Sequence, residues 1–238
     1  MTIDPNIKLA DLVTERPWAA PILERHRLDY CCGGHRRLKD AARTARCNVE
    51  SVIEEIESTP SPVNAPETDV SGMSMTSLID HLEATHHEYL RDALVRLDQL
   101  AEKVRDVHSA NHPELSRVRE LVRALRAELE PHLAKEEQIL FPMIRELEVS
   151  ASLPTFHCGS LGNPISVMMS EHESTGELLE QVRTFNGEFQ VPSDACASYR
   201  ALYEGLSDLE ADTHMHIHKE NNLLFPSVVR AEQALASR

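Results

Sequence analysis

The sequence has few aromatic residues, few glycines and no long apolar run. Phe, Trp and Tyr together make up 4% of its 238 residues, and only eight residues are glycine. Sandwiches and barrels depend on glycine-rich turns and aromatic strand residues, so this composition favours a helical protein. A membrane helix needs roughly 18 or more consecutive apolar residues. The chain has no such run, so we expect no membrane span.

Basic residues are also scarce. The chain carries 24 Lys and Arg against 39 Asp and Glu, which gives a formal net charge of −15. Nucleic acids and anionic membrane surfaces bind clustered Lys and Arg, so neither is expected as the main partner. An acidic protein is better suited to handling cations.

The cysteine content argues against disulfides. There are five cysteines, an odd number, and two of them are adjacent, which does not make a disulfide framework. The first residues lack the basic and apolar regions of a signal peptide, which predicts a cytoplasmic protein with free thiols. We expect Cys47 and Cys196 to be small core residues.

The first quarter of the chain predicts several short helices between about residues 6 and 58. One is expected to begin near His35, and Asn48 is predicted to be the N-cap of the last one. Residues 59–75 then include three prolines and little apolar content, which indicates a linker. We therefore predict a small helical domain over residues 1–58, a linker over 59–75 and a second domain over 76–238.

The second domain contains four long helical patterns with leucine-rich stripes. They cover about residues 76–107, 113–147, 165–189 and 193–232. Short connections within the first pair and within the second pair favour antiparallel neighbours. The predicted fold is all-α, an up-down-up-down four-helix bundle preceded by the small helical domain.

One helix segment occurs twice. Residues 132–142 read HLAKEEQILFP, and residues 216–226 read HIHKENNLLFP. In each copy a His stands four residues before a Glu, which places an imidazole and a carboxylate on one helix face. Both copies end in Leu-Phe-Pro, and the prolines, Pro142 and Pro226, are predicted to kink their helices.

The preceding helices match in the same way. His216 follows His132 by 84 residues, and His172 follows His87 by 85. Equivalent helix pairs would bring six side chains together in the middle of the bundle: His87, His132, Glu136, His172, His216 and Glu220.

Six such ligands are more than one metal ion ordinarily uses, so we expect two ions. Each Glu would bridge them and each ion would take two imidazoles, with room for an oxo or hydroxo bridge and a small ligand. Imidazole and carboxylate suit iron, manganese or zinc, and we favour two iron ions because open positions fit oxygen or nitrogen-oxide chemistry. The alternative is a core of hydrogen-bonded histidines, which would cost about 1 to 3 kcal/mol for each unsatisfied group.

Other side chains are weaker candidates. Glu128 and Glu171 are predicted to orient ligands or carry protons, and His108 to act as an outer ligand or gate. Their alternative is an ordinary surface or core position. His157 and Cys158, in the connection before residue 165, either cover the site or lie in an exposed loop.

Cys31 and Cys32 stand in the segment 29–34, DYCCGG. Adjacent cysteines rarely form a relaxed disulfide. A following helix start and the charges of Arg36 and Arg37 would favour the thiolate, so we predict a redox or metal-transfer pair. A turn with buried thiols is the alternative.

The duplicated His-x-x-x-Glu segments, with His87 and His172 before them, resemble the hemerythrin-like di-iron bundle. Together with Cys31 and Cys32 in a leading domain, the chain resembles the bacterial iron-sulfur cluster repair di-iron proteins over residues 8 to 230. It departs from them in a longer connection over residues 148–164.

This resemblance implies a di-iron centre on the six side chains. It also implies repair of iron-sulfur clusters damaged by nitric oxide or peroxide, by delivery of iron, with damaged iron-sulfur proteins as partners. Two alternatives are a di-iron nitric oxide reductase and a module that binds or senses oxygen. The cysteine domain weighs against the second of these, and the sequence leaves open whether the chain forms a homodimer.

Overall fold

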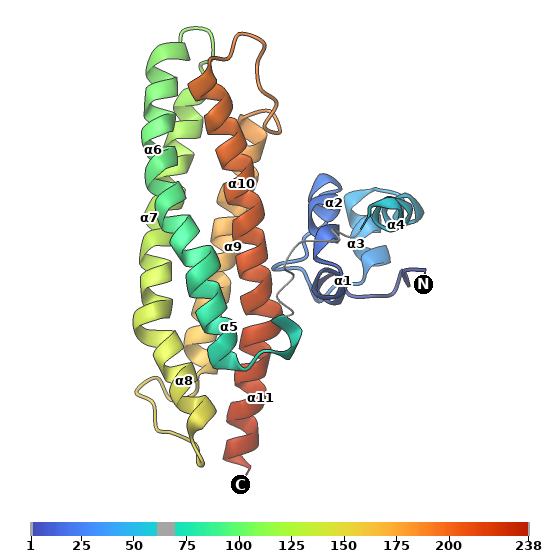
Figure 1. Cartoon of the computed structure of the whole chain (residues 1–238), viewed down its shortest axis with the longest axis vertical. Helices are drawn as coiled ribbons and strands as arrows, with labels where there is room; N and C mark the ends of the chain where they lie inside the picture. The colour runs from blue at the N-terminus through green and yellow to red at the C-terminus, as the bar shows by residue number, and fades with distance from the viewer. Residues whose placement is uncertain (1, 61–69, 238) are drawn as a thin grey trace.

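The computed structural model describes residues 2–60 and 70–237, and within them every regular element is helical. Four rods stand side by side and alternate in direction, which confirms the predicted all-α bundle (Figure 1). Their elements are α5 (Met75–Leu82) with α6 (Glu88–His108), α7 (Leu115–Lys135) with α8 (Phe141–Val149), α9 (Gly162–Phe185), and α10 (Ala197–Lys219) with α11 (Phe225–Ala236).

A smaller group of helices precedes the bundle. It consists of α1 (Leu9–Glu15), α2 (Ala20–Arg25), α3 (Leu38–Ala45) and α4 (Val49–Ser58), with a 3-10 turn at Pro17–Ala19. The Asn48 side chain accepts the N–H of Ser51 at 2.9 Å, which confirms the predicted N-cap of α4. α3 begins three residues later than predicted. Of the predicted linker, residues 61–69 lie outside the described residues, and Met75 already belongs to α5.

The bundle has two apolar cores separated by a polar layer. Leu90, Leu133 and Leu209 belong to one core, and Leu82 and Leu224 belong to the other. In the first and last rods the predicted metal ligands fall between these leucines. The polar layer is therefore enclosed by apolar side chains above and below, which lowers the effective dielectric around it.

Three of the four rods contain a five-residue π-helical turn at this layer. The turns are Glu83–His87, Glu136–Leu140 and Glu220–Leu224, and each is closed by a hydrogen bond to a carbonyl five residues earlier. Two of them directly precede the Phe-Pro pairs. The helices continue past both prolines, so the widened turns, which the sequence did not reveal, accommodate residues without an N–H. π turns of this kind are frequent at functional sites.

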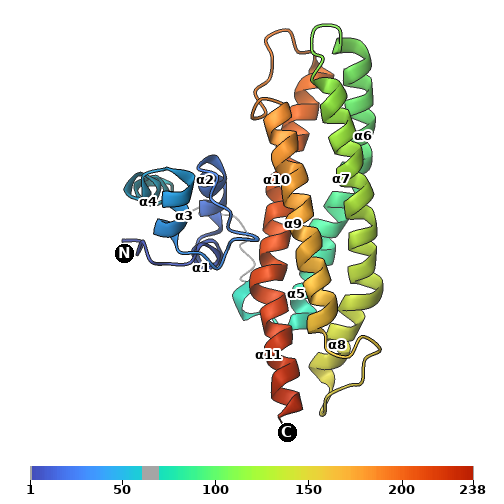
Figure 2. The ribbon, with the colours of Figure 1, turned by 180° about the vertical axis from the view of Figure 1, so that it is seen from behind.

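The small N-terminal unit lies against α10 and the π turn that follows it (Figure 2). His218 is 2% exposed there, with Nε2 3.2 Å from the Thr14 hydroxyl. A Cβ added to Gly34 would lie 2.5 Å from the Tyr30 carbonyl and 2.7 Å from Asn222 Oδ1. Only glycine allows this close approach, which explains one of the two glycines after the cysteine pair.

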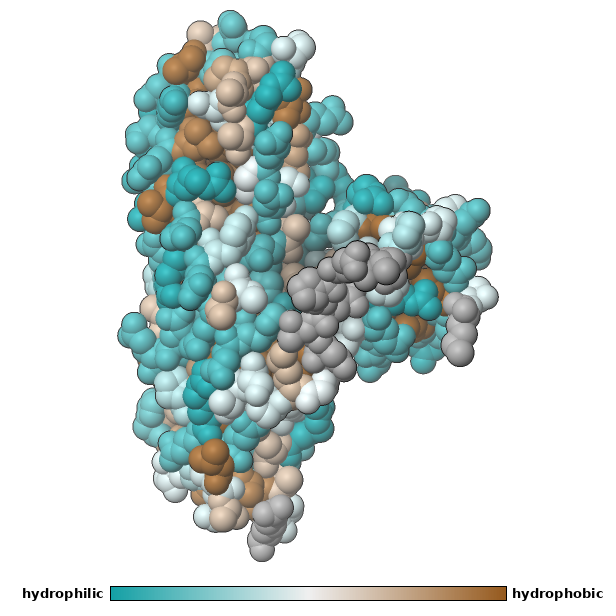
Figure 3. All heavy atoms as spheres, viewed as in Figure 1, coloured by the Kyte–Doolittle hydropathy of each residue, from teal (hydrophilic) through white to brown (hydrophobic). Residues whose placement is uncertain are grey.

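The visible surface is mostly hydrophilic over both parts of the molecule, as the charge of −15 leads one to expect (Figure 3). Among the helices of the described segments, none is both long and apolar enough to cross a membrane.

Glu148, near the end of α8, accepts the N–H groups of Met75 and Thr76 at 2.7 and 2.8 Å and so caps α5. Burial raises the pKa of Glu148, but these hydrogen bonds outweigh it and the pKa is lowered. We expect Glu148→Gln to cost about 1 kcal/mol of unfolding free energy at pH 7. A lowered pKa contributes stability above the unfolded pKa, so this difference should shrink as the pH falls below about 4.

Urea unfolding of both proteins across this pH range measures the effect. The matched control is Glu146→Gln, on the same helix with an exposed side chain, which should change stability by less than about 0.5 kcal/mol. An equal loss at every pH would contradict the capping role.

Candidate metal centre

The structure brings the six predicted side chains together in the polar layer. His87, Glu136 and Glu220 come from the three π turns, His132 and His216 lie one turn before the glutamates, and His172 lies in α9. All six are at most 3% exposed. The four helices therefore meet at one enclosed point, where the duplicated segments of the sequence predicted them to meet.

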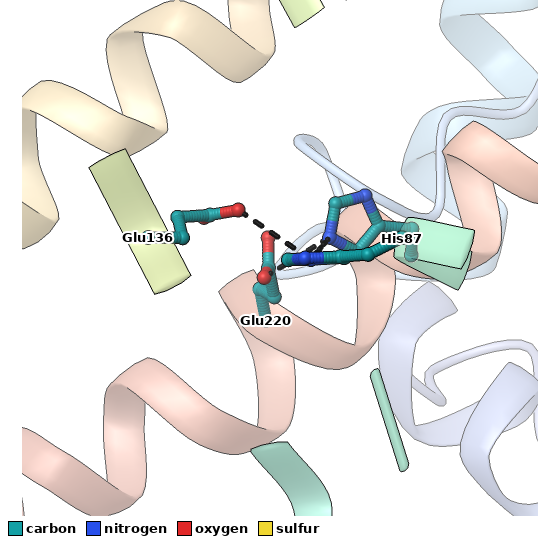
Figure 4. A group of neighbouring side chains, drawn as sticks. His87, Glu136 and Glu220 are labelled. Carbon is teal, nitrogen blue, oxygen red and sulfur yellow. Dashed lines mark hydrogen bonds and ion pairs between the residues drawn. The ribbon is translucent and has the colours of Figure 1, made fainter. Parts of the chain in front are cut away.

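The six side chains form two groups that share both glutamates. In one group, Nε2 of His87 and Nε2 of His216 are 3.1 Å apart. In the other, the same atoms of His132 and His172 are also 3.1 Å apart. In each group the four ligand atoms lie within 4.8 Å of one another. Figure 4 shows His87, Glu136 and Glu220 pointing toward one another from separate helices.

Each glutamate reaches both groups. Glu136 places one oxygen 3.7 Å from His87 Nε2 and the other 3.4 Å from His132 Nε2. Glu220 places its oxygens 3.1 Å from His216 Nε2 and 3.2 Å from His172 Nε2. Among the described residues, none of these four oxygens has a hydrogen-bond partner of good geometry. Buried carboxylates without donors are costly, and cations between them and the imidazoles would satisfy both.

Outer side chains fix the orientation of three imidazoles. Nδ1 of His87 lies 2.8 Å from Glu137, and Nδ1 of His132 lies 2.8 Å from Glu171. Nδ1 of His172 lies 2.9 Å from Oδ1 of Asn221. An acceptor at Nδ1 holds the proton there and leaves the Nε2 lone pair directed at the centre, the arrangement that metal-binding histidines use.

The duplication of the sequence explains which side chains contact Nδ1 of the imidazoles from outside the centre. Glu137 and Asn221 occupy the same place in the two copies, directly after Glu136 and Glu220, and this register could have identified both from the sequence. Glu171 corresponds to His86 in the first half. Glu171 accepts the Nδ1 proton of His132. His86 does not accept the corresponding proton of His216 but stacks on its ring, with centroids 5.7 Å apart. Accordingly, Nδ1 of His216 has no partner within the described chain.

His86 belongs to a second polar network beside the centre. Its Nδ1 lies 2.8 Å from Asp212, and its Nε2 lies 2.7 Å from the Lys219 ammonium. Lys219 also lies 2.9 Å from His81. Burial is the main cause that lowers the pKa of His86 to about 4, so this imidazole is neutral at pH 7.

The charges of the centre favour a cation. Burial raises the pKa of Glu220, but His216 and His172 outweigh it and hold the pKa well below its usual value. Burial lowers the pKa of His132, but Glu136 and Glu220 outweigh it and raise the pKa to about 9. Glu220 is therefore a carboxylate at neutral pH, as binding of a hard or borderline cation requires.

The cysteine pair approaches the centre through Asn221. The Asn221 amide that accepts from His172 also has its Nδ2 3.9 Å from Cys32 Sγ. A cleft of about 670 Å³ opens over both thiols, between the N-terminal unit and α9. The cysteine segment is therefore one side chain away from a predicted metal ligand.

The prediction that the Cys31 thiol is activated as a thiolate does not agree with the structure. Cys31 is buried, and a hydrogen bond with Cys32, burial and the charge of Asp29 raise its pKa well above the usual value. The helix start lies further away than predicted, at Leu38, and Arg36 reaches Thr44 at 2.7 Å instead of a thiol. The buried-thiol alternative holds for Cys31, whereas Cys32 is half-buried at the cleft.

Two outer candidates lie away from the centre. Glu128 is exposed on α7, and His108 is the last residue of α6, about 30 Å along the helix from His87. At a rise of about 1.5 Å per residue, the spacing between His87 and His108 by itself places His108 far from the centre, so the predicted role of His108 as an outer ligand or gate is wrong. Cys196 is exposed, not a core residue, and Cys158 packs its Sγ 4.0 Å from Met143 Sδ, away from the six side chains.

Comparison with known proteins agrees with this architecture. Residues 78–228 match the Hemerythrin HHE cation binding domain, and residues 5–59 match a Domain of Unknown function (DUF542) called ScdA_N.

Three relatives are similar over nearly the whole chain. The iron-sulfur cluster repair protein ScdA of Staphylococcus haemolyticus is 32% identical over 91% of this chain and 95% of its own length. YtfE of an Enterobacter species, also named an iron-sulfur cluster repair protein, is 34% identical over 94% and 97%. A probable iron-sulfur cluster repair protein of Haemophilus influenzae is 35% identical over 93% and 96%. The chain thus belongs to the family of iron-sulfur cluster repair proteins that combine an ScdA_N domain with a hemerythrin HHE cation binding domain.

Proposed function

We propose that this protein holds two iron ions and repairs iron-sulfur clusters damaged by nitrosative or oxidative stress, by supplying iron. The observation that carries the proposal is the pair of buried glutamates, whose four oxygens lack hydrogen-bond partners among the described residues and face two pairs of imidazoles. The names of the relatives support repair as the activity.

The donor set fits two cations. Each group offers two imidazole nitrogens and two carboxylate oxygens, a set that suits iron and that zinc or manganese also accept. His87, His132, His172 and His216 would bind, and Glu136 and Glu220 would bridge. The proposal includes the oxo or hydroxo bridge expected from the sequence. Bound iron would supply both the transferable metal and its redox chemistry.

The N-terminal unit is proposed to contact the damaged iron-sulfur protein. Cys32 lies at the cleft, half-buried and 3.9 Å from the Asn221 amide that holds His172. A soft thiol one side chain away from a proposed ligand of the centre is suited to accept iron from it or to contact a damaged cluster. Damaged iron-sulfur proteins are therefore the proposed partners, and we place the boundary between the two units in residues 59–75.

Two measurements on the purified protein test the proposal. Elemental analysis should return about two irons per chain, as in other di-iron carboxylate bundles. The iron-loaded protein should also restore an enzyme whose [4Fe–4S] cluster nitric oxide has damaged, without added iron. Cys32→Ser should keep the iron and slow the restoration.

Each of these two measurements has a result that would contradict the proposal. Fewer than one iron per chain after anaerobic loading would exclude the dinuclear site. A full iron content without restoration would leave the site standing and exclude repair. Consumption of nitric oxide with a reductant, in the absence of restoration, would indicate an enzyme that reduces nitric oxide instead.

A further inference from the structure

Four side chains of the types that bind zinc form two contacting pairs at the end of the bundle far from the metal centre. The turn between α6 and α7 and the loop between α9 and α10 both lie at this end (Figures 1 and 2). The turn carries His108 and His112, and the loop carries Asp194 and Cys196. None of these residues has a part in the proposed function, and His108 is about 30 Å from His87 along α6.

The backbone holds the two histidines on one side. His108 ends α6, and the N–H of His112 donates to the His108 carbonyl at 2.9 Å, so one further turn of helical geometry joins them. Residues four apart on such a turn project in the same direction. Both imidazoles lie against Tyr199, with ring centroids at 5.2 and 5.4 Å, and Tyr199 is fully buried.

The opposite loop presents the other two groups. Cys196 occupies the N-cap position of α10, but its side chain makes no capping hydrogen bond. Instead its Sγ lies 3.2 Å from Nε2 of His108. Asp194, two residues earlier, places its oxygens 3.1 and 3.2 Å from Nε2 of His112.

Each of these two pairs has nearly the separation of two neighbouring ligand atoms on a zinc ion. With Zn–S near 2.3 Å and Zn–N near 2.0 Å, neighbouring ligand atoms are about 3.3 to 3.6 Å apart. The pairs His108 with Cys196 and His112 with Asp194 already have nearly this separation. The two imidazole rings are 6.5 Å apart between centroids, so the two pairs would have to draw closer to share one ion.

We propose that His108, His112, Asp194 and Cys196 form a zinc site that joins the two loops. Thiolate, imidazole and carboxylate are the ligands that Zn²⁺ takes in proteins, and the thiolate distinguishes this set from the sulfur-free centre in the bundle. On binding, the Cys196 thiol proton leaves to solvent and a metal–sulfur bond forms. Glu114, 3.0 Å from Nδ1 of His112, orients that ring as an outer acceptor.

The site would act as a clamp. It connects the end of α6 to the start of α10, two neighbouring helices of the bundle. A metal that binds the folded state and not the unfolded chain raises stability in proportion to its affinity. We therefore expect bound Zn²⁺ to raise the unfolding temperature without altering the iron content.

The test uses protein already loaded with iron, so that the bundle centre is filled. Titration with Zn²⁺ by calorimetry should show about one further ion per chain. Co²⁺ in its place should produce a thiolate-to-metal absorption band. Cys196→Ala and His108→Ala should remove the band or weaken Zn²⁺ binding by at least about 100-fold, since even outer partners of metal ligands cost 10- to 100-fold.

Matched controls come from the same chain. Cys47→Ala removes a thiol of the N-terminal unit, and His157→Ala removes an exposed imidazole; both should leave Zn²⁺ binding unchanged. Circular dichroism and iron content show whether each variant folds. Wild type without a further Zn²⁺ ion would overturn the proposal. Equal affinity in wild type and Cys196→Ala, or a Co²⁺ spectrum without thiolate character, would do the same.

Discussion

Changing Glu136 to Gln is expected to reduce bound iron from about two ions per chain to one or none. The Glu136 carboxylate faces both groups, with its oxygens 3.7 Å from His87 Nε2 and 3.4 Å from His132 Nε2. An amide is neutral and turns N–H groups toward one of the ions. We expect the affinity for iron to fall by at least about 100-fold, measured by competition with a chelator.

The control is Glu128→Gln, two turns earlier on the same rod, where the side chain is exposed. It should retain full iron content. Glu220→Gln should behave like Glu136→Gln, because both glutamates face the same two groups. Retention of both irons by Glu136→Gln would show that the metals bind elsewhere.

Changing Phe141 to Ala is expected to cost about 3 to 5 kcal/mol of unfolding free energy. Phe141 is fully buried in the core below the polar layer and stacks on His87 with ring centroids 5.6 Å apart. Its counterpart Phe225 stacks on His172 at 6.1 Å. Removing Phe141 therefore opens a cavity and frees a ligand, so iron affinity should fall together with stability.

Urea unfolding of metal-free and iron-loaded protein separates the two effects. Phe141→Leu should lose less stability than Phe141→Ala because it leaves a smaller cavity. Phe185→Ala, at a side chain that is 44% exposed, should change stability by less than about 0.5 kcal/mol. If Phe141→Ala costs no more than this control, the stacked phenylalanine does not support the centre.

The duplicated Leu-Phe-Pro endings have a structural role that periodicity could not show. Sequence spacing predicted a proline kink or a helix end; the helices continue, and a π turn stands directly before each Phe-Pro pair. In the folded protein the turn begins at Glu136 or Glu220, and the phenylalanine after it stacks on an imidazole of another helix. The π turn depends on contacts between helices, which a single helical pattern does not contain.

The six side chains of the centre were predictable for a simple reason. A helix repeats every 3.6 residues, so His132 with Glu136 and His216 with Glu220 had to share a face. The second copy then placed His87 and His172. Glu137 and Asn221 were missed because each serves a histidine on another helix, although their matched positions in the repeat carried the signal.

The reactivity of Cys31, in contrast, could not be predicted from the sequence. The reactivity of a cysteine depends on its burial and on nearby charge, and the neighbouring residues in the sequence determine neither. Asp29 accepts the N–H groups of Cys31 and Cys32, both at 3.0 Å, and its charge raises the pKa of Cys31. Arg36 and Arg37, close in sequence, bind other partners.

The sequence by itself determined the all-α bundle and the set of six side chains in its middle, because both follow from periodicity and from duplication along single helices. Only the tertiary structure decided which acceptors orient the imidazoles, that Cys31 is buried beside a carboxylate, and that His108 meets Cys196 at the far end. These depend on distances between helices that are remote in the chain. Such distances are set by packing of the whole molecule and not by local spacing.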